Sequence, residues 1–210
     1  VKTNNKIALI TGITGQDGLF LTSQLIEKNK KANIIGISRD NGKLFFNKIH
    51  TLNKNFTAEN IHLVNVDLQD SNEILSLLEK FKPSQIFNLT GPSSVYESIK
   101  KPELYNQSIP NIFNILTNSC IQLRIFPSFF QASSSETFDK HNTLPLNEKS
   151  DFKPRTPYAK AKYEVYKKVQ ALRETYDWNI KSGIMFNHES EFRDEGYLFS
   201  KIIDSAIKIK

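Results

Sequence analysis

A tyrosine and a lysine one helical turn apart are the first candidates for chemistry. Tyr158 and Lys162 are separated by four positions, so on a helix both side chains lie on one face. A lysine ammonium near a phenol stabilises the phenolate and lowers the phenol's pKa, so the tyrosine can accept a proton from a substrate hydroxyl. The alternative is an exposed Tyr/Lys face of a helix, since the spacing is common and Tyr163 and Tyr166 lie nearby.

A serine-rich segment strengthens the catalytic interpretation. Residues 131–136 read QASSSE and follow an expected strand. Ligands of open α/β sheets bind at the carboxyl ends of the strands. Hydroxyl groups at that position can hydrogen-bond the oxygen that Tyr158 deprotonates, and Glu136 adds a carboxylate. The alternative for Glu136 is a loop acid or a helix cap.

Three glycines near the N-terminus have the spacing of a phosphate-binding turn. Gly12, Gly15 and Gly18 lie between the first expected strand and the first expected helix. The first glycine allows a tight turn, the second lets the backbone approach a pyrophosphate, and the third lets the helix pack against the strand. The N-terminus of that helix then offers free N–H groups to the phosphates. The alternative is a glycine turn required only for packing.

The ends of the second and third strands bear on which dinucleotide is preferred. Arg39 follows the second strand, where an arginine can accept the 2′-phosphate of NADP, and the neighbouring Asp40 has the opposite charge. Asp67 and Leu68 follow the third strand, where an adenine edge is expected. We therefore expect NADP rather than NAD. The alternatives are that Arg39 is a solvated loop residue and that Asp67 caps the next helix.

Short apolar runs alternate with segments of helical periodicity along the whole chain. The expected strands are 6–11, 33–38, 61–66, 84–89, 124–131 and 179–186, and the expected helices are 17–28, 70–81, 102–123, 157–176 and 197–210. Pro110 is expected to disturb the first turns of its helix, and 39–60 and 137–155 are expected to be surface loops. Crossover connections of this kind require parallel strands. The sequence thus predicts one α/β domain, a Rossmann-like doubly wound parallel sheet with helices on both faces.

Composition excludes several classes of function. The 210 residues carry a net charge of +6, but the lysines are spread over the chain and form no block of like charges, so we expect no nucleic-acid partner. No apolar run is long enough to span a bilayer, and no signal peptide is recognisable, so we expect no membrane partner. A single cysteine, Cys120, fits a cytoplasmic location. We expect no metal site.

Four segments together resemble a known family. They are 10–18 (ITGITGQDG), 131–136 (QASSSE), 154–162 (PRTPYAKAK) and 186–190 (FNHES). On these residues the chain resembles the GDP-mannose 4,6-dehydratase family of the extended short-chain dehydrogenase/reductase superfamily, from about Lys6 to its last residue. The resemblance implies that 1–210 is the N-terminal, NADP-binding portion. It also implies that 187–210 leads into a smaller C-terminal substrate portion that is largely absent.

The resemblance implies a role for each catalytic residue. Tyr158 removes the proton from the sugar 4-hydroxyl while hydride passes from C4 to NADP, and Lys162 holds the cofactor ribose and tunes Tyr158. Glu136 takes the C5 proton and helps to expel the C6 hydroxyl as water, and the hydride returns to C6. Ser134 stands where the family usually has threonine and donates to the 4-oxygen. An epimerase or reductase needs no carboxylate there, so Glu136 favours a dehydratase.

The resemblance also implies the binding residues. The cofactor set is Gly12, Ile13, Thr14, Gly15, Gln16, Asp17, Gly18, Arg39, Asp67, Leu68, Leu89, Thr90, Ser93, Tyr158, Lys162, His188 and Arg193, and the substrate set is Ser94, Ser134, Glu136 and Asn187. The chain departs from the family where Ser94 replaces a histidine, where Phe138 and Asp139 replace Tyr-Gly, and where Glu191 and Phe192 replace Pro-Arg. These departures bear on the sugar.

The expected function is a nucleotide-sugar 4,6-dehydratase, a lyase that acts on GDP-mannose. The alternatives are a related sugar nucleotide such as a GDP-heptose, an epimerase or reductase of the same superfamily, and an NADP-binding regulatory module without turnover. The helices expected at 102–123 and 157–176 resemble those that pair between subunits in the superfamily, so we expect a homodimer or homotetramer.

Overall fold

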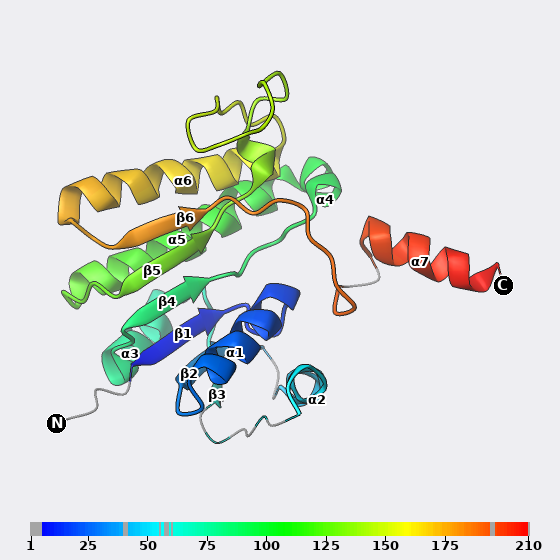
Figure 1. Cartoon of the computed structure of the whole chain (residues 1–210). Coiled ribbons are helices and arrows are strands. Elements are labelled where there is room, and N and C mark those ends of the chain that lie inside the picture. The colour runs from blue at the N-terminus through cyan, green and yellow to red at the C-terminus, as the bar shows by residue number, and fades with distance from the viewer. Residues whose placement is uncertain are drawn as a thin grey trace.

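A parallel six-stranded sheet forms the centre of the computed structural model, which describes residues 6–39, 42–54, 56, 59, 61–193 and 196–209 (Figure 1). Its strands are β1 (Ile7–Thr11), β2 (Asn33–Ile37), β3 (Ile61–Val64), β4 (Gln85–Asn88), β5 (Ser128–Ala132) and β6 (Ile180–Gly183). The spatial order is β3-β2-β1-β4-β5-β6, and every neighbouring pair is parallel. The order reverses between β1 and β4, so the crevice at the carboxyl ends of these two strands is the expected ligand site.

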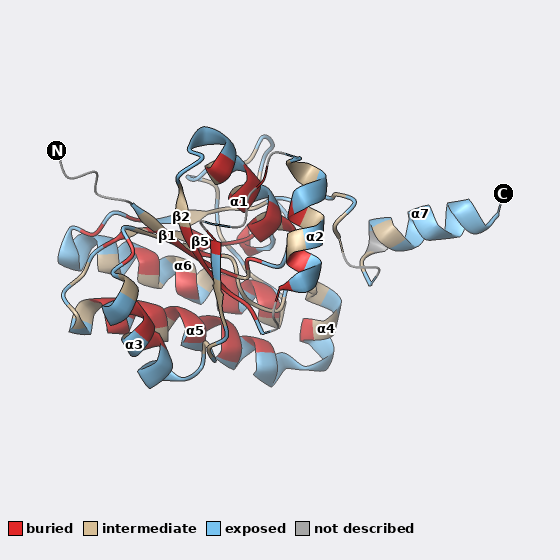
Figure 2. Cartoon of the chain, turned by 90° about the horizontal axis from the view of Figure 1, so that it is seen from below, coloured by how far each residue is buried: buried red, intermediate tan, exposed pale blue. Residues whose placement is uncertain are grey.

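Helices cover the sheet in two unequal layers. The helices are α1 (Gln16–Lys28), α2 (Lys43–Leu52), α3 (Ser71–Phe81), α4 (Val95–Lys100), α5 (Pro102–Gln122), α6 (Pro157–Tyr176) and α7 (Leu198–Lys208), with a short 3₁₀ turn, η2 (Ser135–Thr137). Residues of α3, α5 and α6 share one apolar cluster with the sheet, and residues of α1 and α2 share the other. Figure 2 shows the buried residues of α5 and α6 turned towards the strands. The fold is therefore the doubly wound Rossmann-like sheet that the sequence predicts.

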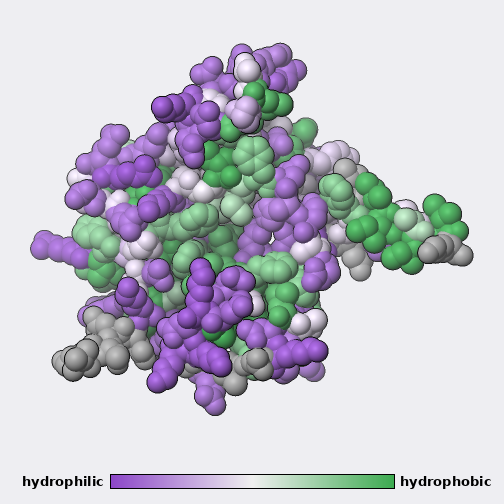
Figure 3. All heavy atoms as spheres, in the orientation of Figure 1, coloured by the Kyte–Doolittle hydropathy of each residue, from purple (hydrophilic) through white to green (hydrophobic). Residues whose placement is uncertain are grey.

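One face of the sheet is covered over β1 and β2 but open over β5 and β6. The rings of Phe87 and Phe130 lie together on that face with their centroids 6.3 Å apart, and Phe130 packs over Gly183. Figure 3 shows hydrophobic residues gathered in the middle of this face and along α7. On α7, Phe199 and Ile203 are more than half exposed. Among the described residues, the apolar side chains on this face of β4–β6 are therefore half-buried, whereas those of α7 are exposed.

The structure corrects three expectations about the elements. The region 39–60 contains α2, which buries Phe45 and Ile49 under the sheet, so it is not simply a loop. Helix α5 continues through Pro110, because the buried face around it packs on the core. Strand β5 begins only after Pro127, which has no N–H to donate to a ladder.

Within the described residues, no helix is long and apolar enough to cross a membrane.

Candidate active site

The glycine turn after β1 has the conformation that its sequence predicts. Gly12 has a φ of +69°, and a Cβ there would lie 3.1 Å from the Leu89 carbonyl carbon and from Thr90 Oγ1. A Cβ on Gly18 would lie 2.5 Å from Gly12 O and from Ile13 Cα, so α1 can pack this closely only with glycine. The turn therefore brings the start of α1 against the ends of β1 and β4.

The first turn of α1 is free to bind an anion. Its N-cap is Gly15, which is exposed and offers no side-chain cap to the helix. Thr14 is also exposed, whereas the side chain of Ile13 is fully buried in the core and leaves only its backbone for a ligand. Uncapped N–H groups at a helix N-terminus attract phosphate.

The segment after β6 is tied to this helix terminus. His188 Nε2 lies 2.7 Å from Asp17 Oδ1, Gln16 Nε2 donates to the carbonyl of His188 at 3.3 Å, and Ser190 Oγ donates to Gln16 Oε1 at 2.8 Å. The hydrogen bond to the Phe186 carbonyl, and then that to Asp17, raises the pKa of His188. The structure thus joins the FNHES segment to the glycine turn 170 residues away, while Asn187 beside it is exposed.

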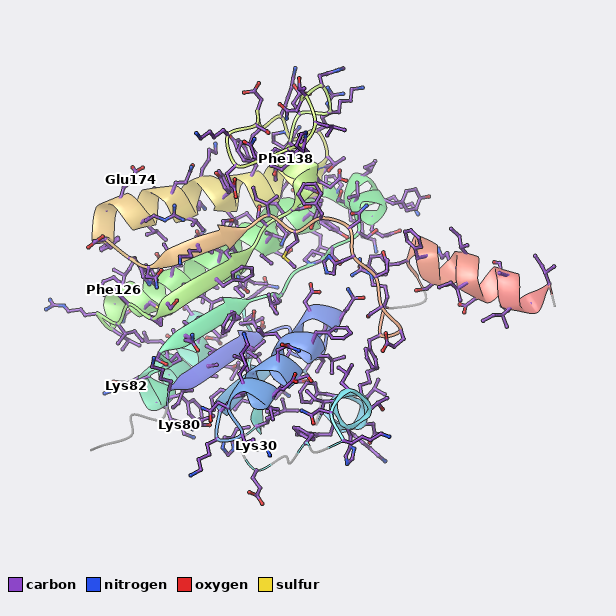
Figure 4. The ribbon with its side chains drawn as sticks, viewed as in Figure 1. Lys30, Lys80, Lys82, Phe126, Phe138 and Glu174 are labelled. Atoms are coloured by element: carbon purple, nitrogen blue, oxygen red, sulfur yellow. The ribbon has the colours of Figure 1, made fainter. Side chains whose placement is uncertain are left out.

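Tyr158, Ser134 and Glu136 meet at the carboxyl end of β5. Tyr158 is the second residue of α6 and is 8% exposed, and the buried hydroxyl of Ser134 lies close enough to its phenol to act against a raised pKa. Ser134 caps η2 by accepting from the N–H of Glu136 at 3.3 Å. The exposed Glu136 carboxylate is close enough for its charge to act on the phenol. Figure 4 shows Phe138 after this turn, far from Phe126 and Lys82 at the amino ends of the strands.

Lys162 is buried directly below Tyr158. Its Nζ donates to the carbonyl of Ala132 at 2.9 Å and lies 5.8 Å from the centre of the Tyr158 ring. Burial lowers the pKa of Lys162 to about 8, and the Asp17 carboxylate opposes that shift. An ammonium group has three donors, and the carbonyl of Ala132 uses one of them.

The sequence prediction that Tyr158 has a lowered pKa is wrong for this structure. Burial raises the pKa of the Tyr158 phenol, and the negative charge of Glu136 raises it further. The hydrogen bond from Ser134 and the charge of Arg193 act in the opposite direction but do not outweigh burial. The reason is that desolvation penalises a phenolate more than the polar groups present here stabilise it.

The loop after β4 carries one buried hydroxyl without a partner. Thr90 Oγ1 has no hydrogen-bond partner among the described residues. The buried hydroxyl of Ser133, which follows β5, has none there either. Leu89 and Ser93 are partly accessible here, and Ser93 Oγ hydrogen-bonds with the Tyr197 hydroxyl. Buried polar atoms of this kind are usually satisfied by a ligand or water. Together with the glycine cradle, they fit a bound dinucleotide.

Ser94, which the sequence analysis expects in substrate binding, caps a helix in the structure. Its hydroxyl is the N-cap of α4 and accepts from the N–H of Glu97 at 3.1 Å. The hydroxyl is therefore already engaged in the helix start, and α4 is an element that the sequence interpretation did not include. A contact with substrate would use the O–H group or the second lone pair of Ser94 Oγ.

The residues after β2 and β3 are accessible, as a ligand contact requires. Arg39 is exposed at the end of β2, and Asp40 lies outside the described residues. Asp67 is exposed and accepts from the N–H of Gln69 at 2.9 Å, whereas Asp70 caps α3. The alternative that Asp67 caps the helix is therefore wrong. Leu68 packs partly against the core.

Arg193 stacks on a residue that the sequence interpretation did not single out. Its guanidinium carbon lies 3.8 Å from the centre of the Tyr197 ring, and its Nε lies 3.5 Å from the Glu189 carboxylate. Arg193 and Tyr197 both lie close enough to the phenol of Tyr158 to influence its pKa, so both residues belong to the site. Tyr197 was overlooked because it stands at the start of an amphipathic helix.

Three further polar residues lie beneath the site and were also overlooked. Thr11, Asn88 and Gln131 are buried and pair in register across β1, β4 and β5. The available signal was a polar residue at or next to the end of each of three apolar strands.

Comparison with known proteins agrees with this geometry. The family model described as GDP-mannose 4,6 dehydratase matches residues 9–210. A GDP-mannose 4,6-dehydratase from Sinorhizobium fredii is 34% identical over 99% of this chain and 60% of its own length. The corresponding enzyme of Cricetulus griseus is 36% identical over 97% of this chain and 56% of its own length. The chain thus spans somewhat more than half of these curated relatives.

Solved structures share the fold at lower identity. A UDP-N-acetylglucosamine 4-epimerase from Methanobrevibacter ruminantium superposes with a TM-score of 0.81 and 24% identity, over 98% of this chain and 64% of that one. A dTDP-glucose 4,6-dehydratase from Streptomyces venezuelae, solved with NAD, has a TM-score of 0.80 and 16% identity, over 96% of this chain and 62% of that one. Since the family model covers nearly the whole sequence, the chain belongs to the GDP-mannose 4,6-dehydratase family.

Proposed function

We propose that the protein to which this chain belongs is a nucleotide-sugar 4,6-dehydratase that converts GDP-mannose to GDP-4-keto-6-deoxymannose and water. The observation that carries the proposal is the placement of the Glu136 carboxylate near the phenol of Tyr158. A dehydratase needs one base at the sugar 4-hydroxyl and a second at C5, and these two residues supply both. The curated relatives at 34–36% identity support the same activity.

Each side chain has a defined task in this proposal. Tyr158 takes the proton of the 4-hydroxyl, and the hydroxyl of Ser134 donates to the same oxygen. Glu136 takes the C5 proton, which a ketone at C4 makes acidic, and passes it to the C6 hydroxyl, which leaves as water. NADP, when bound, would supply the hydride acceptor for C4 and the hydride donor for C6, with a proton added at C5, so no cofactor would be consumed. Because burial raises the pKa of Tyr158, we expect activity to rise with pH through the neutral range.

The cofactor is proposed to lie along the glycine turn. The backbone of Gly12–Gly18 and the N-terminus of α1 would hold its phosphates, and Thr90 would use its free hydroxyl. Lys162 has two ammonium donors left for a ribose. We propose NADP rather than NAD because Arg39 is exposed at the end of β2, where it can pair with a 2′-phosphate.

The wider organisation is proposed on the same basis. Residues 1–210 form the NADP-binding domain, with 187–210 leading into a smaller substrate portion such as the relatives' greater length provides. We propose a homodimer or homotetramer that pairs through α5 and α6, and a cytoplasmic location. A GDP-heptose is the second substrate candidate, because Ser94 and the residues after FNHES depart from the family pattern.

Mass spectrometry of the whole protein with GDP-mannose and a trace of NADP tests the proposal. We expect the sugar nucleotide to lose one water without net formation of NADPH. Loss of water from another sugar nucleotide alone would move the substrate and keep the chemistry. Inversion of configuration at a sugar carbon without loss of water would favour an epimerase. The absence of any reaction despite NADP binding would favour a regulatory module.

A further inference from the structure

A hydrogen-bond chain of one buried hydroxyl and two buried amides crosses three strands just below the site. Thr11 pairs with Asn88 between β1 and β4, and Asn88 pairs with Gln131 between β4 and β5. All three side chains are at most 2% exposed. Thr11 Oγ1 donates to Asn88 Oδ1 at 2.6 Å, Asn88 Nδ2 donates to Gln131 Oε1 at 2.7 Å, and Gln131 Nε2 donates to the carbonyl of Ala132 at 3.0 Å.

The direction of every hydrogen bond in this chain is fixed by its last member. A backbone carbonyl can only accept, so Gln131 must turn its NH₂ group towards Ala132 and its oxygen towards Asn88. Asn88 must then donate, which turns its own oxygen towards Thr11 and obliges that hydroxyl to donate. The positive end of both amides therefore points towards Ala132.

The same carbonyl of Ala132 is the acceptor for Lys162. It accepts from Lys162 Nζ at 2.9 Å and from Gln131 Nε2 at 3.0 Å. We propose that Thr11, Asn88 and Gln131 are positioning residues, whose hydrogen-bond chain fixes this carbonyl for Lys162 and directs a row of positive amide ends at its ammonium. This inference rests on the proposed function for the use that catalysis makes of Lys162.

The consequence of this arrangement is a lysine that holds its proton weakly. Two donors compete for one carbonyl, and the nearer end of each amide has the same sign as the ammonium. Burial lowers the pKa of Lys162 to about 8. Under this proposal the positive amide ends lower the pKa of Lys162 further. The other ionisable groups facing Lys162 are Asp17 from α1, which raises its pKa, and the phenol of Tyr158 on its own helix.

Lysine ¹³C NMR titration of the protein without cofactor measures the pKa of Lys162 directly, with Lys162→Arg used to assign its signal. Gln131→Met keeps the volume but removes the donor, so we expect the pKa of Lys162 to rise by about one unit, the size of a hydrogen bond to a charged group. Thr11→Val leaves Asn88 free to turn and should give a smaller rise. Thr11→Ser keeps the hydroxyl and should titrate as wild type.

Thr117→Val is the matched control, because it removes a buried threonine hydroxyl whose hydrogen bonds, among the described residues, stay within α5. Its Lys162 should titrate as wild type. An unchanged or lowered pKa in Gln131→Met would overturn the inference. If Gln131→Met does not fold, the comparison of Thr11→Val with Thr11→Ser decides, and equal pKa values in those two would overturn it.

Activity gives a second and independent readout. In the whole protein, we measure the rate of water loss from GDP-mannose as a function of pH. The alkaline limb of this profile should shift to higher pH in Thr11→Val and stay in place in Thr117→Val. A loss of stability alone would lower activity without moving the limb. If the wild type turns over no sugar nucleotide, the proposed function fails, whereas the NMR titration still decides the role of the hydrogen-bond chain.

Discussion

His188 Nε2 lies 2.7 Å from Asp17 Oδ1, and this contact joins the segment after β6 to the first turn of α1. The other ring nitrogen, Nδ1, lies 2.6 Å from the carbonyl of Phe186. Both nitrogens thus face acceptors, an arrangement that favours the doubly protonated imidazolium. The contact therefore places an ion pair between His188 and Asp17 beside the glycine turn.

The contact between His188 and Asp17 makes the free energy of unfolding depend on pH. The hydrogen bonds to Phe186 and Asp17 raise the pKa of His188 above its usual 6.5. The folded state therefore holds this proton more tightly, and the stabilisation is complete below pH 6.5 and is lost as the pH rises through the folded-state value. We expect His188→Gln to destabilise the protein at pH 6 and to have a smaller effect at pH 8, as measured by urea unfolding.

His62→Gln, at an exposed position on β3, is the control for this series. It should leave the wild-type dependence of stability on pH in place. A cost of His188→Gln that is the same at pH 6 and pH 8 would contradict an imidazolium at this contact.

Gly18→Ala should lower both stability and cofactor affinity. The added Cβ would lie 2.5 Å from Gly12 O and Ile13 Cα, so α1 must move away from the turn. Overpacking of this kind costs about 1–3 kcal/mol in the free energy of unfolding. Denaturant unfolding and NADPH titration measure the two effects. Gly196→Ala is the control, because no atom of the described residues, its chain neighbours aside, lies within 4 Å of its Cβ position. Equal behaviour of the two variants would refute the close approach.

Most of the fold could be predicted from the sequence because its signals are local. Helix α6 begins and ends where the sequence predicts, since Thr156 caps it, Pro157 occupies its first position and Asp177 ends it with a φ of +48°. Helix α2 was missed because Gly42 gives it no side-chain cap and only Phe45 and Ile49 mark its buried face.

The candidate site likewise has features that the sequence indicates and features that depend on the fold. The glycine turn and the spacing of Tyr158 and Lys162 are linear motifs, so the sequence alone indicates them. Asn88 and Gln131 are 43 residues apart and become neighbours only when β4 pairs with β5. The raised pKa of Tyr158 was also beyond reach of the sequence, because burial depends on how α6 packs against the sheet.

Glu136→Gln should separate the two halves of the proposed reaction. The amide cannot take the C5 proton, so the rate of water loss should fall by about 10²–10⁴, the usual contribution of a general base. The exposed position of Glu136 means that folding and NADPH binding should survive. Mass spectrometry of the product and fluorescence titration of NADPH measure the two. Exposed Glu148→Gln is the control, and a Glu136→Gln enzyme as fast as that control would remove Glu136 from the mechanism.

Lys162→Met should stabilise the protein at neutral pH while it abolishes activity. Burial lowers the pKa of Lys162 to about 8 from 10.5, so the unfolded chain binds this proton more tightly than the folded one. Folding with a charged Lys162 is therefore penalised in full below pH 8, and the penalty disappears as the pH rises towards 10.5. Removing the charge removes the penalty, so the gain from Lys162→Met should be largest at pH 7 and smaller at pH 9.5.

Urea unfolding at the two pH values measures this gain, and Lys160→Met on the exposed side of α6 is the control, for which we expect no such pH dependence. A Lys162→Met protein that is less stable than wild type at both pH values would show that packing of the lysine stem outweighs its charge. The expected pattern would instead show that the buried charge of Lys162 lowers the stability of the fold. That cost is explained by function, because a charged side chain beneath Tyr158 can stabilise a phenolate and bind a ribose.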